Sequence, residues 1–77
     1  IRQKLPEEWR MYMTIREAGK GIVITGGGTY RIGFINTDGQ EDETELDGYN
    51  LTELEELYRE FCKENGFRQN TVTYVER

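Results

Sequence analysis

The sequence predicts a two-layer α+β domain: a four-stranded antiparallel meander, one helix across one face of that sheet, and a fifth C-terminal strand (β-β-β-β-α-β). Apolar and polar residues alternate in the first part of the chain, which is typical of strands with one buried face. Between Leu51 and Asn65, apolar residues recur every three or four positions and indicate an amphipathic helix. A chain of 77 residues suffices for a single domain, with residues 1–8 expected to be a mobile lead-in.

Three strands are expected before the first polar hairpin loop. The alternation over Trp9–Arg16 predicts the first strand. A turn at Glu17–Lys20 leads to a second strand at Gly21–Thr25, in a register that keeps the apolar side chains of both strands on one face. Three glycines, Gly26–Gly28, then turn the chain into a third strand that starts at Thr29.

The fourth strand is expected to follow a tight hairpin loop. The segment Asn36–Gly39 resembles a type I turn closed by a left-handed glycine, so Asn36 is expected to pair with Gln40. The same register pairs Phe34 with Asp42, Ile32 with Thr44, Tyr30 with Leu46 and Arg31 with Glu45. Because the strand Gln40–Leu46 is mostly acidic, it is expected at an edge of the sheet, where its carboxylates reach water.

The helix carries signals at both ends. Asn50 can cap its first turn with Glu53 completing a capping box, and Gly66 supplies the left-handed residue that ends it. The stripe expected to face the sheet consists of Leu51, Leu54, Leu57, Tyr58, Phe61 and Cys62.

The last strand is expected at Thr71–Val75, with Val72 and Tyr74 pointing inward. Antiparallel pairing with the first strand gives the order 5-1-2-3-4, and the alternative places the fifth strand parallel to the fourth. Both orders leave one face of the sheet without a helix.

The composition excludes several classes of chemistry. Cys62 is the only cysteine and histidine is absent, so neither a disulfide framework nor a cysteine or histidine metal site is expected, and the lone thiol favours a reducing, cytoplasmic setting. The formal net charge of −5 disfavours unselective binding to nucleic acid. No apolar run has the roughly 20 residues that a membrane helix needs, so no membrane association is expected.

None of the reactive residue types occurs in a catalytic context. Gly26–Gly28 runs into a predicted strand rather than a helix, which favours a hairpin turn over a phosphate loop. Cys62 lies on the apolar stripe among glutamates, which favours a buried side chain over a nucleophile. The acidic strand lacks the spacing of a calcium loop. We therefore expect no enzyme activity, no catalytic residue, no metal and no cofactor.

The uncovered sheet face is the candidate for function. Its predicted interaction residues are Arg10, Tyr12, Arg16, Val23, Arg31 and Ile35, and its acidic edge consists of Glu41, Glu43 and Glu45. Arginine and tyrosine are frequent anchors of protein interfaces, and they can also stack on single-stranded nucleic acid. The alternative is an ordinary solvated face on which Arg31 pairs with Glu45.

The C-terminal segment LEELYREFCKENGFRQNTVTYVER, residues 54–77, resembles the closing helix and strand of small uncharacterised bacterial proteins, several of them carried by phages and integrated mobile elements. The resemblance implies an accessory protein of a bacterial cell or of its mobile element. It transfers no functional residue, because it includes no catalytic motif.

These observations predict a small non-catalytic binding or accessory module that acts through protein–protein contact or self-association, including a homodimer. One alternative is a sheet face that binds single-stranded nucleic acid. The other is an acidic DNA mimic that competes, through its acidic edge, for a protein that binds nucleic acid.

Overall fold

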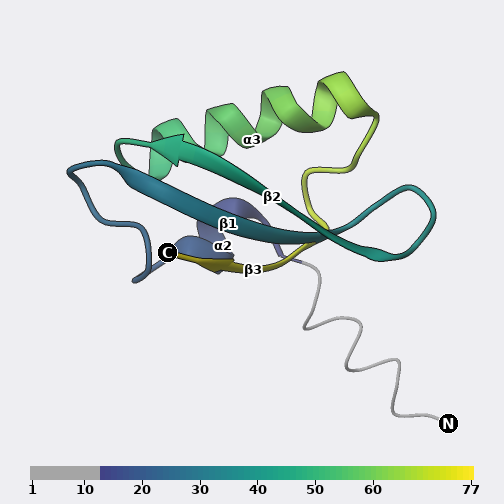
Figure 1. Cartoon of the computed structure of the whole chain (residues 1–77), viewed down its shortest axis with the longest axis horizontal. Helices are drawn as coiled ribbons and strands as arrows, with labels where there is room; N and C mark the ends of the chain where they lie inside the picture. The colour runs from purple at the N-terminus through teal and green to yellow at the C-terminus, as the bar shows by residue number, and fades with distance from the viewer. Residues whose placement is uncertain (1–12) are drawn as a thin grey trace, which may run out of the picture.

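The computed structural model describes residues 13–77, which form one three-stranded antiparallel sheet and two helices (Figure 1). Along the chain the elements are α2 (Ile15–Gly19), β1 (Gly28–Ile35), β2 (Glu41–Gly48), α3 (Leu51–Asn65) and β3 (Val72–Glu76). The α+β character and the antiparallel sheet are confirmed, whereas the four-strand meander with a fifth strand is wrong. The predicted lead-in, residues 1–8, lies outside the described residues.

The central strand is β1, which pairs antiparallel with β2 on one side and with β3 on the other. Neither predicted position of the last strand is therefore correct, because β3 pairs with the third predicted strand. Within the described residues of the first predicted strand, only Met13 forms a bridge. Its partner is Val72, on the edge of β3 that faces away from β1.

The short helix α2 replaces the end of the first predicted strand. The Thr14 hydroxyl accepts the Glu17 N–H, and the Glu17 carboxylate accepts the Thr14 N–H, so the two residues form a reciprocal capping box. This arrangement satisfies free amides at the start of a helix and outweighs the alternation of apolar residues. Ile15 is buried on the inner side of α2.

The second predicted strand, Gly21–Thr25, is a loop. The N–H groups of Ile22 and Val23 both donate to the Gly19 carbonyl, and only Val23 packs against the core. Gly21, Gly26 and Gly27 have φ values of 84°, 129° and 91°, which interrupt an extended run. The edge of β1 that this segment was expected to fill is instead taken by β3.

The hairpin between β1 and β2 follows the predicted register. Phe34 lies opposite Asp42, Ile32 opposite Thr44, Tyr30 opposite Leu46 and Arg31 opposite Glu45. The Asn36 N–H donates to the Gln40 carbonyl, and Gly39 has a φ of 79°, as the turn requires. The acidic strand β2 lies at an edge of the sheet, as expected from its charge.

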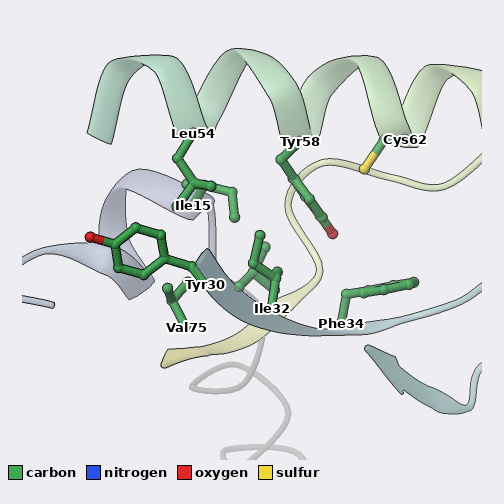
Figure 2. Close-up of a cluster of buried hydrophobic side chains, with 9 residues drawn as sticks. Ile15, Tyr30, Ile32, Phe34, Leu54, Tyr58, Cys62 and Val75 are labelled. Carbon is green, nitrogen blue, oxygen red and sulfur yellow. The ribbon is translucent and has the colours of Figure 1, made fainter. Parts of the chain in front are cut away.

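The core lies between α3 and the sheet (Figure 2). Leu54, Tyr58 and Cys62 of α3 meet the inner face of β1 and are at most 1% exposed. The buried residues of β1 are Tyr30, Ile32 and Phe34. Leu51 and Phe61 are partly buried, but Leu57 is 36% exposed, so its predicted place on the buried stripe is wrong.

Both ends of α3 are where the sequence predicts them. The Asn50 side chain accepts the Glu53 N–H at 2.8 Å, whereas the Glu53 carboxylate accepts the N–H of Tyr49 and not that of Asn50. The predicted capping box is therefore only half formed. Gly66, with a φ of 76°, ends the helix.

The inward residues of β3 differ from the prediction. Val72 is fully buried, but Tyr74 is 38% exposed and Val75 points inward in its place. The pairing between β1 and β3 shifts between Gly33 and Phe34, as in a β-bulge. The additional residue changes which side chains of β3 face the core, which simple alternation does not anticipate.

Two leucines on α3 provide a test of which helical face is buried. We expect Leu54→Ala to lower the free energy of unfolding by about 2–5 kcal/mol, because Leu54 is completely buried. Leu57→Ala is the matched control, and its cost should stay below about 1.5 kcal/mol, because its side chain is already partly in water. Urea unfolding measures both, and equal losses would contradict this packing of α3.

Candidate functional site

Within residues 13–77, no helix covers one face of the sheet. α2 and α3 pack against the other face, where the core lies (Figure 1). Cross-strand partners share a face of a sheet, so the register determines which side chains lie on the uncovered side. We call this surface the open sheet face, and it consists of Thr29, Arg31, Gly33, Ile35, Glu41, Glu43, Glu45, Asp47, Tyr74 and Glu76.

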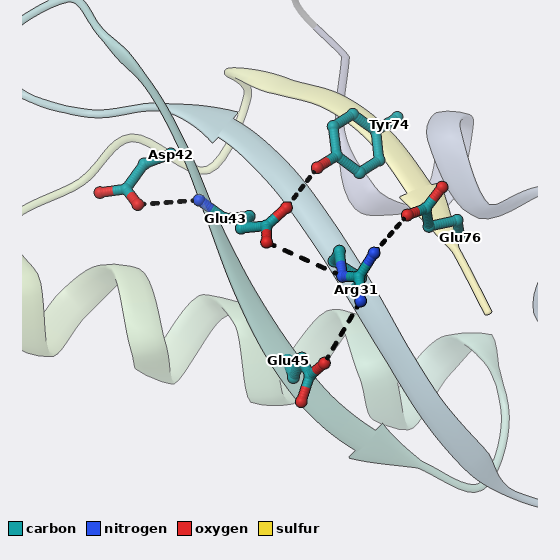
Figure 3. A network of polar contacts seen from close by, with 6 residues as sticks. All are labelled: Arg31, Asp42, Glu43, Glu45, Tyr74 and Glu76. Atoms are coloured by element: carbon teal, nitrogen blue, oxygen red, sulfur yellow. Dashed lines mark hydrogen bonds and ion pairs between the residues drawn. The ribbon is translucent and has the colours of Figure 1, made fainter.

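Arg31 lies at the centre of the open sheet face (Figure 3). Its Nη1 donates to the Glu76 carboxylate at 2.9 Å, and two further carboxylates lie within 4 Å: Glu43 at 3.8 Å and Glu45 at 3.9 Å. The hydrogen bond to Glu76 and the charge of Glu43 raise the pKa of Arg31 further above its usual value. One side chain of β1 thus links to side chains of both neighbouring strands.

The side chain of Tyr74 reaches from β3 across β1 to β2. Its ring, from β3, lies over Gly33 of β1, and a β-carbon at position 33 would collide with that ring. The Tyr74 hydroxyl donates to Glu43 of β2 at 2.7 Å, and this bond raises the pKa of Tyr74. Gly33 is therefore covered by an aromatic ring.

The acidic edge is exposed. The side chains of Glu43 and Glu45 are 55% and 62% exposed, and Glu41 is exposed beside them. At this edge the Asp42 carboxylate accepts the Glu43 N–H at 2.8 Å, which occupies one donor of the edge strand. Such local bonds and charges hinder unselective pairing with a further strand.

The predicted interaction face is only partly assembled. Arg31 and Ile35 lie on the open sheet face, whereas Arg16 belongs to α2 and pairs with Glu55 of α3 at 3.0 Å. Val23 lies in a loop and packs against the core. The remaining two predicted residues, Arg10 and Tyr12, lie outside the described residues.

Sequence reasoning missed Tyr74 and Glu76 as members of the site. Both lie on β3, which was expected beside a different strand and with Tyr74 facing inward. A glycine in the middle of a strand indicates close approach by another group, and Gly33 was the available signal for a covering aromatic side chain.

Two buried side chains of α3, Cys62 and Tyr58, have raised pKa values. Cys62 is 1% exposed, and burial raises the pKa of its thiol, which disfavours the reactive thiolate. Burial also raises the pKa of Tyr58 far above its usual value. Among residues 13–77, no three acidic or cysteine side chains are grouped so as to hold a metal ion.

Comparison of the chain with protein-family models, with curated proteins and with solved structures found no match. Neither helix of the described part is long and apolar enough to cross a membrane.

The contact between Tyr74 and Gly33 can be tested by mutation. Gly33→Ala should lower the free energy of unfolding by about 1–3 kcal/mol, because the added methyl group displaces the ring of Tyr74. In a Tyr74→Ala background the same change should cost clearly less, and urea unfolding of the four chains measures this coupling.

Gly28→Ala is the matched control on β1. A β-carbon there would meet its nearest neighbour, Nη2 of Arg77, only at 3.4 Å, so we expect a change within about 1 kcal/mol of zero. A cost of Gly33→Ala that persists unchanged without the Tyr74 ring would show that this contact is not its cause.

Burial of the Cys62 thiol predicts slow chemical modification. The native chain should react with a thiol reagent at neutral pH far more slowly than the urea-unfolded chain, because the raised pKa and the lack of access both oppose attack. An exposed cysteine, Glu64→Cys in a Cys62→Ala chain, serves as the reference. Native labelling of Cys62 as rapid as that of the reference would overturn the assignment.

Proposed function

We propose that this protein is a small non-catalytic binding module that contacts another protein through its open sheet face. The observation that carries the proposal is the cross-strand network of Arg31, Glu43, Tyr74 and Glu76. Arginine and tyrosine are the residue types most often found as energetic anchors of interfaces. Here both are held in place on a surface that neither helix of the described residues covers.

The network supports binding because it already orders these side chains, so less conformational entropy is lost when a partner binds. An immobilised long side chain typically costs about 0.5–1.5 kcal/mol on association. Arg31 already contacts carboxylates from β2 and β3, and the ring of Tyr74 is held between Gly33 and Glu43. A partner that contacts this surface meets side chains that are already oriented.

The charge of the surface favours protein over nucleic acid as the partner. The open sheet face carries five carboxylates, Glu41, Glu43, Glu45, Asp47 and Glu76, against the single guanidinium of Arg31. Phosphate groups need several uncompensated cations, and Arg31 is already paired. Binding of single-stranded nucleic acid is accordingly the weaker alternative.

Self-association is the other form of protein contact that we consider. Homodimers are the commonest soluble oligomers, but a symmetric dimer that stacks two open sheet faces would bring the same carboxylates together. A different protein is therefore the favoured partner, and a homodimer through the open sheet face remains the second candidate.

The acidic edge supports one further alternative. Glu41, Glu43, Glu45 and Asp47 recur at every second position of β2, so they form a row of negative charges about 6.7 Å apart. A row of this kind could imitate a phosphate backbone and compete for a protein that binds nucleic acid. In that case the partner surface would be basic.

The setting that we propose is the cytoplasm of a bacterial cell, with the protein acting as an accessory factor of the cell or of a mobile element. Support for this setting comes from the resemblance of residues 54–77 and from the free thiol of Cys62.

Affinity capture from bacterial lysate tests the proposal. We expect a protein partner that the wild-type chain retains and that the double variant Glu43→Gln with Glu45→Gln loses. The matched control removes two exposed carboxylates from the outer side of α3, Glu56→Gln with Glu60→Gln, and should retain the partner. Thermal unfolding of each chain verifies that the fold is kept.

Other outcomes separate the alternatives. Loss of the partner with the α3 variant alone would move the interaction away from the open sheet face. A concentration-dependent dimer that the β2 variant changes would favour self-association, and salt-sensitive binding of single-stranded RNA by the wild type would favour the nucleic-acid alternative.

A further inference from the structure

A second surface, which shares only Ile35 with the open sheet face, is hollow. It lies where the loop between β1 and β2 meets the connection from α3 to β3, at one end of the domain (Figure 1). We call it the loop pocket, and the residues that line it are Ile35, Asn36, Thr37, Gly39, Gly66, Arg68, Asn70 and Thr71. Its volume of about 460 Å³ lies in the range of sites for small molecules.

The charge of the loop pocket is opposite to that of the protein. The chain has 15 acidic and 10 basic residues, yet no carboxylate lines the pocket and Arg68 is its one charged residue. Arg16 and Arg31 are engaged with carboxylates, whereas Arg68 makes no ion pair within residues 13–77. A free guanidinium offers a planar fork of donors that matches a carboxylate or a phosphate.

Side-chain amides in the lining can add hydrogen-bond donors. The side-chain oxygen of Asn36 already accepts the N–H groups of Asp38 and Gln40, at 2.9 and 3.0 Å. The NH₂ group of the Asn36 side chain donates one hydrogen bond, to the Asp42 carboxylate at 3.5 Å, and has a second N–H that can donate to a ligand. Asn70 contributes a second side-chain amide to the lining. An anion is therefore better matched to this lining than a cation.

The end of α3 lies beside the loop pocket and would by itself disfavour an anion, since a helix C-terminus carries partial negative charge. Near this end of the helix, the carbonyls of Phe61 and Cys62 accept hydrogen bonds within the cap. The N–H groups of Gly66 and Phe67 both donate to the Cys62 carbonyl, and the Asn65 side chain donates to the Phe61 carbonyl at 2.8 Å. Arg68 follows directly after this cap.

We infer that the loop pocket binds the oxyanion group of a small molecule, a carboxylate or a phosphate, with Arg68 as its principal ligand. Asn36 and Asn70, whose side-chain amides can donate hydrogen bonds, belong to the same lining. The loop pocket shares only Ile35 with the open sheet face, and Arg68 lies outside that face, so this inference and the proposed function can fail separately.

Amide chemical shifts from NMR test the inference on the full chain, with inorganic phosphate and acetate as probes at matched ionic strength. We expect saturable shifts at Gly39, Gly66 and Asn70, which line the pocket. Arg68→Gln should weaken binding by about tenfold or more, the effect of losing a charge-assisted hydrogen bond. The probe that binds more tightly identifies the preferred oxyanion.

Arg59→Gln is the matched control, because it removes an exposed positive charge of α3 that lies outside the loop pocket. It should leave the affinity unchanged. Arg68→Lys retains the charge without the planar fork and should give an intermediate affinity. Shifts that rise linearly without saturation, or equal affinities for the wild type and Arg68→Gln, would overturn the inference.

Discussion

Burial of the inner face of β1 is the constraint on which the rest of the structure depends. Tyr30, Ile32 and Phe34 alternate along the central strand and are almost fully shielded from water. α3 shields these side chains from water. The backbone N–H and C=O groups of the buried strand also need partners, which β2 and β3 provide on its two edges. Each of the other elements is thereby fixed relative to β1, and the side chains on the opposite face of β1 become the surface available for binding.

The parts of the fold that local signals determine could be predicted from the sequence. The hairpin loop ending at Gly39 fixes the register of β1 and β2, and Asn50 and Gly66 mark the ends of α3. The pairing of β3 with β1 could not be read in this way, because it joins residues far apart, such as Arg31 and Glu76. The difference at α2 has a local cause: Thr14 and Glu17 form a capping box that starts a helix within a segment whose apolar residues alternate as in a strand.

The candidate site was predictable to the same extent as its strands. The predicted pairing of Arg31 with Glu45 exists within a larger network, because the hairpin register is correct. Tyr74 and Glu76 could not be placed without the partner of β3, and the bulge on that strand reverses the expected orientation of Tyr74. The loop pocket was also beyond prediction, since it joins two loops whose proximity depends on the position of β3.

The order of the strands along the chain has a consequence for folding during synthesis. β1 and β2 are made in succession and can form their hairpin early, whereas β1 keeps an unpaired edge until residues 72–76 have been made. In that interval α3 can shield the apolar face of β1, but the edge later taken by β3 remains open to pairing with other chains. The nascent protein is therefore most exposed to misassembly along the strand that its finished structure protects best.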